Sequence, residues 1–518
     1  MRAKATTQTV REDETPGDLP EGWALAPAGD VFTFVTSGSR GWAQYYAETG
    51  ALFLRIANLN HDDIAIDLSQ KKYVNPPRSA EGTRTRVKLR DLLISITADV
   101  GMVGLVKHDL GEAYINQHIA LARLAEGLDD AYVSWYIAST GGQKQLGDLQ
   151  RGATKVGLGL DDIRSINLPF APLVEQRRIV AKIDELLEKV NVSRERLAKV
   201  PKILRAFRQA VLASACSGRL TEDWRTEEAN TKDIAPIISS IQKRRESEAN
   251  SPKEKERIRQ IYTQSEEGDS GELPEGWGFV RLNKLCSSFE YGTSAKSQPS
   301  GKVPVLRMGN IQGGKINWTD LAYSSDRDEI RQYELTPQTV LFNRTNSPEL
   351  VGKTAIYLGE HPAIFAGYLI KINRLPEIDA RYLNFCLNTN YARDFCSRVK
   401  TDAVGQSNIN AQKLGTFEVP FCTLGEQHEI ARRVEALFKL ADAIEMRVAT
   451  ATWRTEKLTQ AILAKAFRGE LVPTEAELAR RERRTYEPAS ALLARIRTAT
   501  NEDSNNGAPS KQEKRTAK

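Results

Sequence analysis

The segment of this chain that is most suited to chemistry carries cations at alternate positions. Arg84, Arg86, Lys88 and Arg90 lie in the stretch 83–90, which we call the basic segment. In a β-strand this spacing places all four side chains on one face. Such a face can contact the phosphates or the guanine bases of a nucleic acid. A solvated edge strand is the alternative, because cations also keep strand edges from pairing with other chains. The arginine content favours a binding surface.

A second group of candidate binding residues lies in the C-terminal half of the chain. Arg344 and Asn346 follow an apolar run, and Lys353 stands a few residues further along. These residue types suit the reading of bases, because arginine pairs with guanine and asparagine pairs with adenine in the major groove. Gln406 and Asn408 belong to an amide-rich segment, for which ordinary turn formation is an equally good explanation. The sequence therefore predicts nucleic-acid contacts in both halves.

The sequence motifs of catalysis are incomplete or missing. Asn75-Pro76-Pro77 begins like the signature of amino-methyltransferases, but Arg78 stands where that signature has an aromatic residue. Gly352-Lys353-Thr354 ends like a phosphate-binding loop, but Ser347 occupies the position of the required glycine. The five histidines lack metal-ligand spacing, and the motifs HExxH and GxSxG do not occur. We therefore expect no catalytic, cofactor-binding or metal-binding residues in this chain.

Composition and charge restrict the class of protein further. The chain has 518 residues, 40% of them hydrophobic, and a formal net charge of +6. This length predicts about three to four domains, and the mildly basic charge is compatible with nucleic-acid binding without requiring it. The five cysteines form no C-x-x-C pair, which indicates reduced thiols. The sequence lacks the roughly 20 consecutive apolar residues of a membrane span and the apolar core of a signal peptide. We expect a cytoplasmic protein.

The elements that must position these residues occur twice along the chain. The pentapeptide Leu-Pro-Glu-Gly-Trp stands at 19–23 and again, unchanged, at 273–277. Further matches follow in the same order: Leu54-Arg55 with Leu306-Arg307, Asn58 with Asn310, Leu168-Pro169-Phe170 with Val419-Pro420-Phe421, and Ser217-Gly218-Arg219-Leu220 with Arg468-Gly469-Glu470-Leu471. Such matches indicate two homologous modules rather than a short solenoid repeat. The sequence thus predicts approximate two-fold symmetry, which suits a target with two halves.

Each module is predicted to consist of an α+β lobe and a long helix. The lobes, 19–171 and 273–421, contain short β-rich runs that are separated by glycine-bearing turns and a few helices. In the helices, 172–217 and 422–470, apolar residues recur with the period of about 3.5 residues that is typical of a coiled coil. The predicted seam positions are Ile179, Ile183, Leu186, Val190, Ser193, Leu197, Val200, Leu204, Phe207 and Val211, and Ile430, Val434, Leu437, Ala441, Ile444, Val448, Ala451, Thr455, Leu458 and Ile462.

The equal phase of the two seams predicts that the helices pack on each other. A two-fold axis perpendicular to the helices would make this pair antiparallel. Pro201 is expected to kink the first helix or to begin a new segment. The remaining segments are predicted to be a short helix with a charged linker (218–272), a C-terminal helical segment (471–498), a disordered N-terminus (1–18) and a disordered tail (499–518).

The order lobe, long helix, lobe, long helix resembles the specificity subunit of type I restriction-modification enzymes. Pro-Phe followed by Glu-Gln opens each helix, at 169–176 and 420–427, and the helical segments 169–220 and 420–471 match this family best. The resemblance covers about residues 19–498 and includes the Leu-Pro-Glu-Gly-Trp pentapeptides. The lobes match in outline, as a family whose lobes diverge to read different sequences implies.

The resemblance implies a function and a set of partners. Each lobe would be a target recognition domain that reads one half of a bipartite site in double-stranded DNA. The helices would form an antiparallel spacer on which two methyltransferase (M) subunits dock, and restriction/translocase (R) subunits would join the complex. These partners would use S-adenosylmethionine, ATP and Mg²⁺, whereas this chain would bind no cofactor. The alternatives are a DNA methyltransferase or nuclease with its own degenerate active site, and a helical adaptor that binds only proteins.

The expected helix length agrees with such a role. A helix from Glu426 to Arg468 would be about 65 Å long at ~1.5 Å per residue. Half-sites one turn of DNA apart are about 34–36 Å from centre to centre. A helix pair of this length is long enough to hold two lobes on successive grooves.

Overall fold

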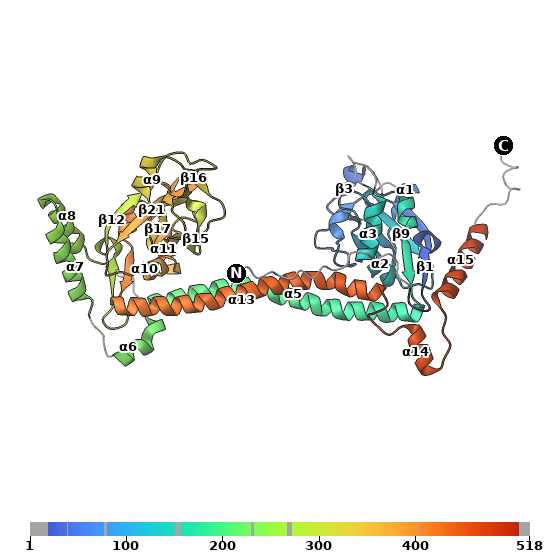
Figure 1. Cartoon of the computed structure of the whole chain (residues 1–518). Coiled ribbons are helices and arrows are strands. Elements are labelled where there is room, and N and C mark those ends of the chain that lie inside the picture. The colour runs from blue at the N-terminus through green and yellow to red at the C-terminus, as the bar shows by residue number, and fades with distance from the viewer. Residues whose placement is uncertain are drawn as a thin grey trace. The chain divides into compact units, whose positions relative to one another are not determined.

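The computed structural model describes residues 19–38, 40–76, 80–150, 157–228, 233–266, 272–403 and 405–506. The predictions for 1–18 and for 507–518 therefore lie outside the described residues. The chain forms two compact units, which are residues 1–197 with 450–518 (unit 1) and residues 198–449 (unit 2). Each unit contains one lobe together with a part of each long helix (Figure 1). Among the described residues, no helix is long and apolar enough to cross a membrane.

The lobe of unit 1 is built around strand β6 (Leu92–Ser95), whose residues are all buried. Complete burial indicates a central strand, and β6 indeed lies between β9 and β7 in a sheet of order β2-β9-β6-β7. A second sheet has the order β3-β5-β4-β8, and β1 pairs with β10. The bounds are β1 Ala24–Pro27, β2 Phe32–Ser37, β3 Tyr46–Ala47, β4 Ala51–Leu54, β5 Tyr73–Val74, β7 Val103–Leu105, β8 Ala113–Ile115, β9 Ile119–Leu124, β10 Asn167–Phe170, α1 Ala80–Thr85, α2 Asp130–Ala138, α3 Thr140–Leu149 and α4 Leu160–Ser165.

The lobe of unit 2 repeats this plan around strand β17 (Thr339–Asn343), which is also completely buried. Its main sheet has the order β12-β21-β17-β19-β15-β14, and smaller sheets have the orders β16-β13-β20, β18-β23-β22 and β11-β24. The bounds are β11 Gly278–Arg281, β12 Cys286–Tyr291, β13 Val303–Leu306, β14 Ile311–Gln312, β15 Gly314–Ile316, β16 Ala322–Ser324, β18 Thr345–Asn346, β19 Thr354–Tyr357, β20 Ile364–Phe365, β21 Leu369–Arg374, β22 Thr401–Ala403, β23 Gln406–Asn408, β24 Glu418–Phe421, α9 Arg327–Tyr333, α10 Ala380–Leu387, α11 Asn390–Val399 and α12 Ala411–Gly415. The predicted α+β class is confirmed in both lobes.

In unit 1 the long helices α5 (Leu173–Cys216) and α13 (Leu424–Phe467) run antiparallel. Arg178, near the start of α5, pairs with Glu475 just beyond the end of α13. Further along α5, Arg194 donates hydrogen bonds at 3.1 Å to the carbonyl oxygen of Thr455 and to the hydroxyl of Thr459. The partner's residue number therefore falls as the number on α5 rises, which defines the antiparallel orientation.

In unit 2 the other parts of α5 and α13 also run antiparallel. Arg208 on α5 donates to Asp442 and Glu445 of α13 at 2.7 and 2.8 Å. Arg433, nearer the start of α13, pairs with Asp223, which follows the end of α5. The predicted pairing of two long helices in antiparallel orientation is thus confirmed inside each unit.

The seam departs from the predicted positions in the part that belongs to unit 1. Leu458 is 42% exposed, whereas Thr459 and Leu463 are buried. Ser193 is exposed as well, and its neighbour Arg194 reaches the other helix instead. The predicted seam is therefore wrong at Leu458 and Ser193. A straight α-helix has about 3.6 residues per turn, so its buried face drifts away from a strict heptad.

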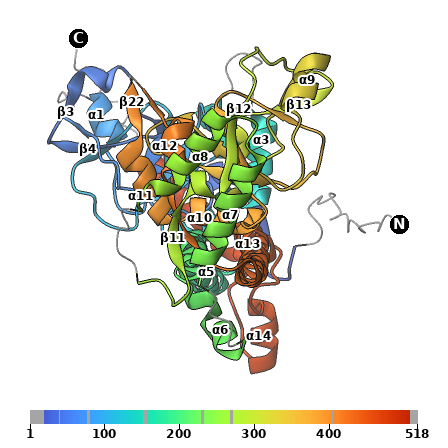
Figure 2. The ribbon, with the colours of Figure 1, turned by 90° about the vertical axis from the view of Figure 1, so that its left-hand side faces the viewer.

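Helices extend through three other segments of the chain. Helix α5 is continuous through Pro201, so no new segment begins there. The predicted linker at 218–272 contains α6 (Glu222–Glu228) and a hairpin of α7 (Ala235–Glu248) and α8 (Pro252–Thr263), which lie side by side in Figure 2. The tail prediction fails for 499–506, because α15 (Ala489–Asn506), which follows α14 (Glu475–Glu482), includes these residues.

Candidate nucleic-acid interface

The basic segment does not form the predicted strand. Helix α1 includes Arg84, Arg86 makes an isolated bridge to Tyr114, and a turn follows. In that turn the backbone N–H of Lys88 donates to the Asp91 carboxylate at 2.7 Å. The prediction is wrong because this buried carboxylate, which is also paired with Arg123, closes the chain into a turn.

The alternation of exposed cations with buried residues, which a strand would produce, is nevertheless present. Thr85 and Val87 are buried, whereas the side chains of Arg84, Arg86 and Lys88 are exposed. Exposed cations remain suitable for phosphate contacts, so their binding role stays a prediction.

Arg90 differs from the other cations of the basic segment. Its backbone has a φ of 73°, and its guanidinium forms two hydrogen bonds with the Asp130 carboxylate, at 2.5 and 3.2 Å. These hydrogen bonds raise the pKa of Arg90. A contact with DNA would have to replace this ion pair, so Arg90 is the least suitable of the four.

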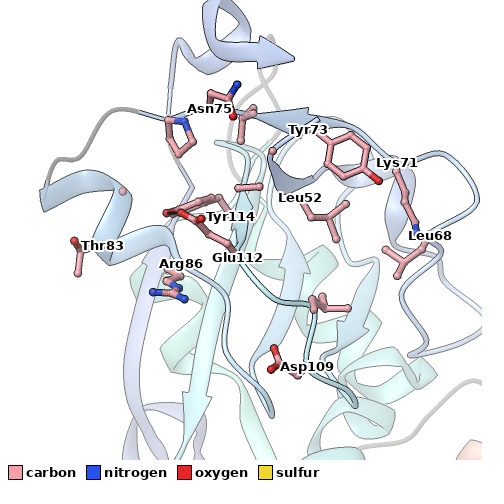
Figure 3. A pocket seen from close by; sticks show the side chains of 16 residues that line it. Leu52, Leu68, Lys71, Tyr73, Asn75, Thr83, Arg86, Asp109, Glu112 and Tyr114 are labelled. Carbon is pink, nitrogen blue, oxygen red and sulfur yellow. Dashed lines mark hydrogen bonds between the residues drawn. The ribbon is translucent and has the colours of Figure 1, made fainter. Parts of the chain in front are cut away.

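Next to the basic segment lies a cavity of about 1100 Å³. Figure 3 shows Arg86 and Lys71 on its wall together with the carboxylates of Asp109 and Glu112. Burial, together with a 2.7 Å hydrogen bond to Glu112, raises the pKa of Tyr114 to about 12. The mixed charges do not single out an anion or a cation as the ligand. Among the described residues, no group of three or more His, Cys, Asp or Glu side chains could hold a metal ion.

In unit 2 the structure brings four of the predicted residues together. Strand β18, which contains Asn346, pairs with β23, which contains Gln406 and Asn408. Arg344 precedes β18 and donates to the Asn408 amide oxygen at 3.2 Å. The Asn408 amide in turn donates to the hydroxyl of Thr345 at 2.8 Å. These contacts hold the guanidinium in place, and the side chain of Gln406, on the same strand as Asn408, is exposed.

A tyrosine that the sequence did not indicate completes this cluster. The Arg344 guanidinium stacks over the Tyr291 ring, 4.5 Å from its centroid. Tyr291 lies more than fifty positions earlier in the chain, and only the pairing of distant segments brings it here. An isolated aromatic residue of this kind carries no motif from which its role could be predicted.

The side chain of Lys353 donates to the Gln312 side chain at 3.2 Å. The neighbouring Gly352 has a φ of 91°, and a Cβ atom there would lie 2.5 Å from the sulfur of Cys396. Tight packing and backbone conformation therefore explain this glycine without a phosphate-binding loop.

The Glu-Gln motif at the start of each long helix has a structural role. In unit 1, Glu175 accepts hydrogen bonds from the Trp23 indole at 2.9 Å and from the backbone N–H of Glu475 at 2.7 Å. Gln176 binds the carbonyl oxygen of Ala171 and the backbone N–H of Asp129. Burial raises the pKa of Glu175. The motif thus attaches the lobe to the helix on which it rests.

Unit 2 repeats this arrangement. The Trp277 indole donates to Glu426 at 2.9 Å, and Gln427 binds the carbonyl oxygen of Cys422 and the backbone N–H of Asp379. The repeated residues therefore form the scaffold, and the exposed polar residues of the two lobes differ.

The chain is similar to known proteins over most of its length. The model of the family described as "Type I restriction modification DNA specificity domain" matches residues 274–449. The chain is 27% identical over 467 residues to the type I restriction enzyme EcoKI specificity subunit of Escherichia coli (strain K12), covering 88% of this chain and 90% of that relative. It is 30% identical over 343 residues to the EcoDI specificity subunit of Escherichia coli, covering 64% of this chain and 68% of that relative.

Two solved structures share the fold. A chain from a study of complex assembly in the type I R-M system has a TM-score of 0.62 at 20% identity, covering 88% of this chain and all of that one. The HsdS subunit from Thermoanaerobacter tengcongensis has a TM-score of 0.54 at 20% identity, covering 88% and 99%.

Proposed function

Because the chain belongs to the family of type I restriction enzyme specificity subunits, we propose that it is the DNA-recognition subunit of a type I restriction-modification complex. In this role each lobe reads one half of a bipartite site in double-stranded DNA. The chain itself catalyses no reaction, and it selects the sequence on which partner subunits act.

The observation that supports this proposal most directly is that the two lobes share a scaffold but have different polar groups on it. Both units attach their lobe through the same buried contacts, from Trp23 to Glu175 and from Trp277 to Glu426. The polar groups of the lobes are different, with the exposed cations of the basic segment in one and the half-buried cluster around Arg344 in the other. A chain that reads two unlike half-sites requires this combination, because shared residues cannot distinguish the two sequences.

We propose M subunits, two per complex, and R subunits as protein partners. Large apolar side chains on the long helices support protein docking, since exposed apolar groups mark interaction surfaces. Trp453 in unit 1 is 60% exposed and Ile203 in unit 2 is 61% exposed. S-adenosylmethionine, ATP and Mg²⁺ would serve these partners, and the complex would work in the cytoplasm.

The decisive experiment maps methylated adenines in the DNA of cells that contain the methyltransferase subunit, with and without this chain. Methylation of one bipartite sequence that depends on the chain is the expected result. The purified chain, tested alone with labelled S-adenosylmethionine, is expected to transfer no methyl group. Methyl transfer by the chain alone would favour the alternative, an enzyme with a degenerate active site.

We also propose that the long helices set the distance between the half-sites. A heptad inserted after Val448 would keep the local phase and add about 10 Å to one helix at ~1.5 Å per residue. The recognised spacing should then change or be lost, and a matching insertion after Leu197 should favour a longer spacer. Methylation of DNA duplexes with a range of spacer lengths measures this. If a folded variant still prefers the same spacer length, the helices do not set the distance between the half-sites.

A further inference from the structure

A short turn occupies the same place in both lobes. In unit 1 it precedes β9, and the backbone N–H of Ile96 donates to the carbonyl oxygen of His118 at 2.9 Å. In unit 2 it precedes β21, and the N–H of Arg344 donates to the carbonyl oxygen of Tyr368 at 3.0 Å. His118 and Tyr368 are therefore equivalent positions, and Ile96 is equivalent to Arg344.

A second pairing extends this equivalence by one position. Thr97 in unit 1 bridges Gly157, and Thr345 in unit 2 pairs with Asn408, in both cases antiparallel. Gly157 therefore occupies the place of Asn408. At these two positions, which the structure describes in both units, unit 1 has Ile96 and Gly157 in place of the arginine and the amide of unit 2.

In unit 1 the turn itself supplies the polar groups. Gln117 is exposed and His118 is half-buried. The Nδ1 atom of His118 shares a hydrogen bond of 2.5 Å with the hydroxyl of Thr97, and its Nε2 atom lies 3.1 Å from the Gln117 amide nitrogen. The contact with Thr97 holds the ring in one orientation, and the exposed amide of Gln117 lies against the other ring nitrogen.

We infer that Gln117 and His118 read bases in the half-site of the first lobe, in place of Arg344 and Asn408 in the second. This inference rests on the proposed function. Glutamine forms paired hydrogen bonds with adenine, and the Nε2 atom of His118 can bond a base edge when the Gln117 amide turns from it to the DNA. Equivalent backbone positions with different hydrogen-bonding groups give two lobes of one fold different sequence preferences.

The basic segment has no equivalent charge in the other lobe. Arg86 bridges Tyr114 in unit 1, and Glu334 makes the same antiparallel bridge to Ile364 in unit 2. The next residues also agree, because Val87 and Leu335 donate to carbonyl oxygens in the same register. A carboxylate at this position repels a phosphate, so the segment is not a phosphate contact common to both lobes. We expect the segment to add affinity to the first lobe alone, whereas the turn at Gln117 supplies base selection.

The test substitutes into the first lobe the residues that the second lobe carries at this turn. The variants are Gln117→Gly, His118→Tyr and the pair together, with Gln117→Ala as a minimal change of an exposed side chain. Each is combined with the methyltransferase subunit and assayed on duplexes in which every base of both half-sites is randomised. Lys88→Ala, in the basic segment, is the matched control.

Loss of selectivity by roughly 5- to 150-fold at adjacent bases of one half-site is the expected result, with the other half-site unchanged. Lys88→Ala should weaken methylation of all sequences alike. Unchanged base preference in both Gln117→Ala and His118→Tyr, while the wild-type complex methylates a bipartite site, would overturn the inference and leave the proposed function intact. Absence of any sequence-specific methylation by the wild-type complex would instead remove the proposed function on which the inference rests.

Discussion

Removal of the Glu426 carboxylate should destabilise unit 2 more than removal of the equivalent Glu175 carboxylate destabilises unit 1. Its Oε1 accepts hydrogen bonds from Thr221 at 2.7 Å and from Arg225 at 2.5 Å, and its Oε2 accepts from the Trp277 indole at 2.9 Å. The side chains of Glu426 and Arg225 are only 5% and 13% exposed. The carboxylate therefore joins the start of α13 to the segment that follows α5.

Glu426→Ala leaves the Arg225 charge and the Trp277 N–H in a site with little access to water. Loss of one partner from a buried ion pair costs about 3–5 kcal/mol. The equivalent variant, Glu175→Ala, removes an acceptor that binds two neutral donors, the Trp23 indole and a backbone N–H. We expect about 1–3 kcal/mol for that control, because it leaves no charged donor without its partner.

Hydrogen exchange of peptides from 211–228 measures this effect locally, which is necessary because two units need not unfold together. At ~1.4 kcal/mol per tenfold change, Glu426→Ala should accelerate exchange by roughly 10²- to 10³-fold or more. Glu175→Ala should leave these peptides unchanged. Adding Arg225→Met to Glu426→Ala should recover part of the loss, since the unpaired charge is removed. Acceleration below tenfold, or strict additivity of the two changes, would refute the reasoning.

Three further predictions concern charge, pH and oxidation. Alanine at an exposed cation of the basic segment should lower the salt slope of DNA binding by about 0.9 if that cation contacts a phosphate, and an unchanged slope in every variant would show that the segment is merely solvated. Hydrogen bonds from Arg432, and then from Arg433, lower the pKa of Glu429 from 4.5 to about 2. Its stabilisation is therefore complete above pH 4.5 and is lost as the pH falls towards 2. In urea unfolding, Glu429→Gln should cost about 0.5–1 kcal/mol at pH 7, because Arg432 is mostly exposed, and nothing near pH 2; a constant difference would contradict this. The sulfur atoms of Cys216 and Cys386 lie 3.4 Å apart, so diamide, which takes up the two thiol hydrogens, should link them, as mass spectrometry can detect. The contact with Cys386 and burial raise the pKa of Cys216, so the reaction should be slow at neutral pH. The absence of this link in the wild type after prolonged oxidation would count against the geometry.

The sequence by itself determined the plan of the molecule. The two Leu-Pro-Glu-Gly-Trp pentapeptides and the matched Pro-Phe and Glu-Gln pairs identified two modules, and both units show the same buried contacts at these residues. The heptad pattern identified the long helices and their pairing, which each unit confirms. These features were predictable because repeats and hydrophobic periodicity are local properties of a sequence.

The tertiary structure decided what those patterns leave open. Period-two spacing predicted a strand through Arg86, but a buried carboxylate at Asp91, held by Arg123 from a distant strand, produced a turn. The heptad pattern placed Leu458 in the seam, but the geometry of a straight helix moved Thr459 there. The turn depends on an ion pair with a residue far away in the sequence. The seam depends on how the buried face of the helix shifts from one turn to the next. Neither can be read from a short stretch of sequence.

The residues proposed to contact bases were also predictable only in part. Arg344 and Asn408 were identifiable by residue type, but the ring of Tyr291 and the hydrogen bond between the two side chains required the folded sheet. Gln117 and His118 carry no motif. Their equivalence to the second lobe rests on backbone hydrogen bonds between segments far apart in the chain, and strand register, which tertiary packing sets, determines which side chains meet at that edge.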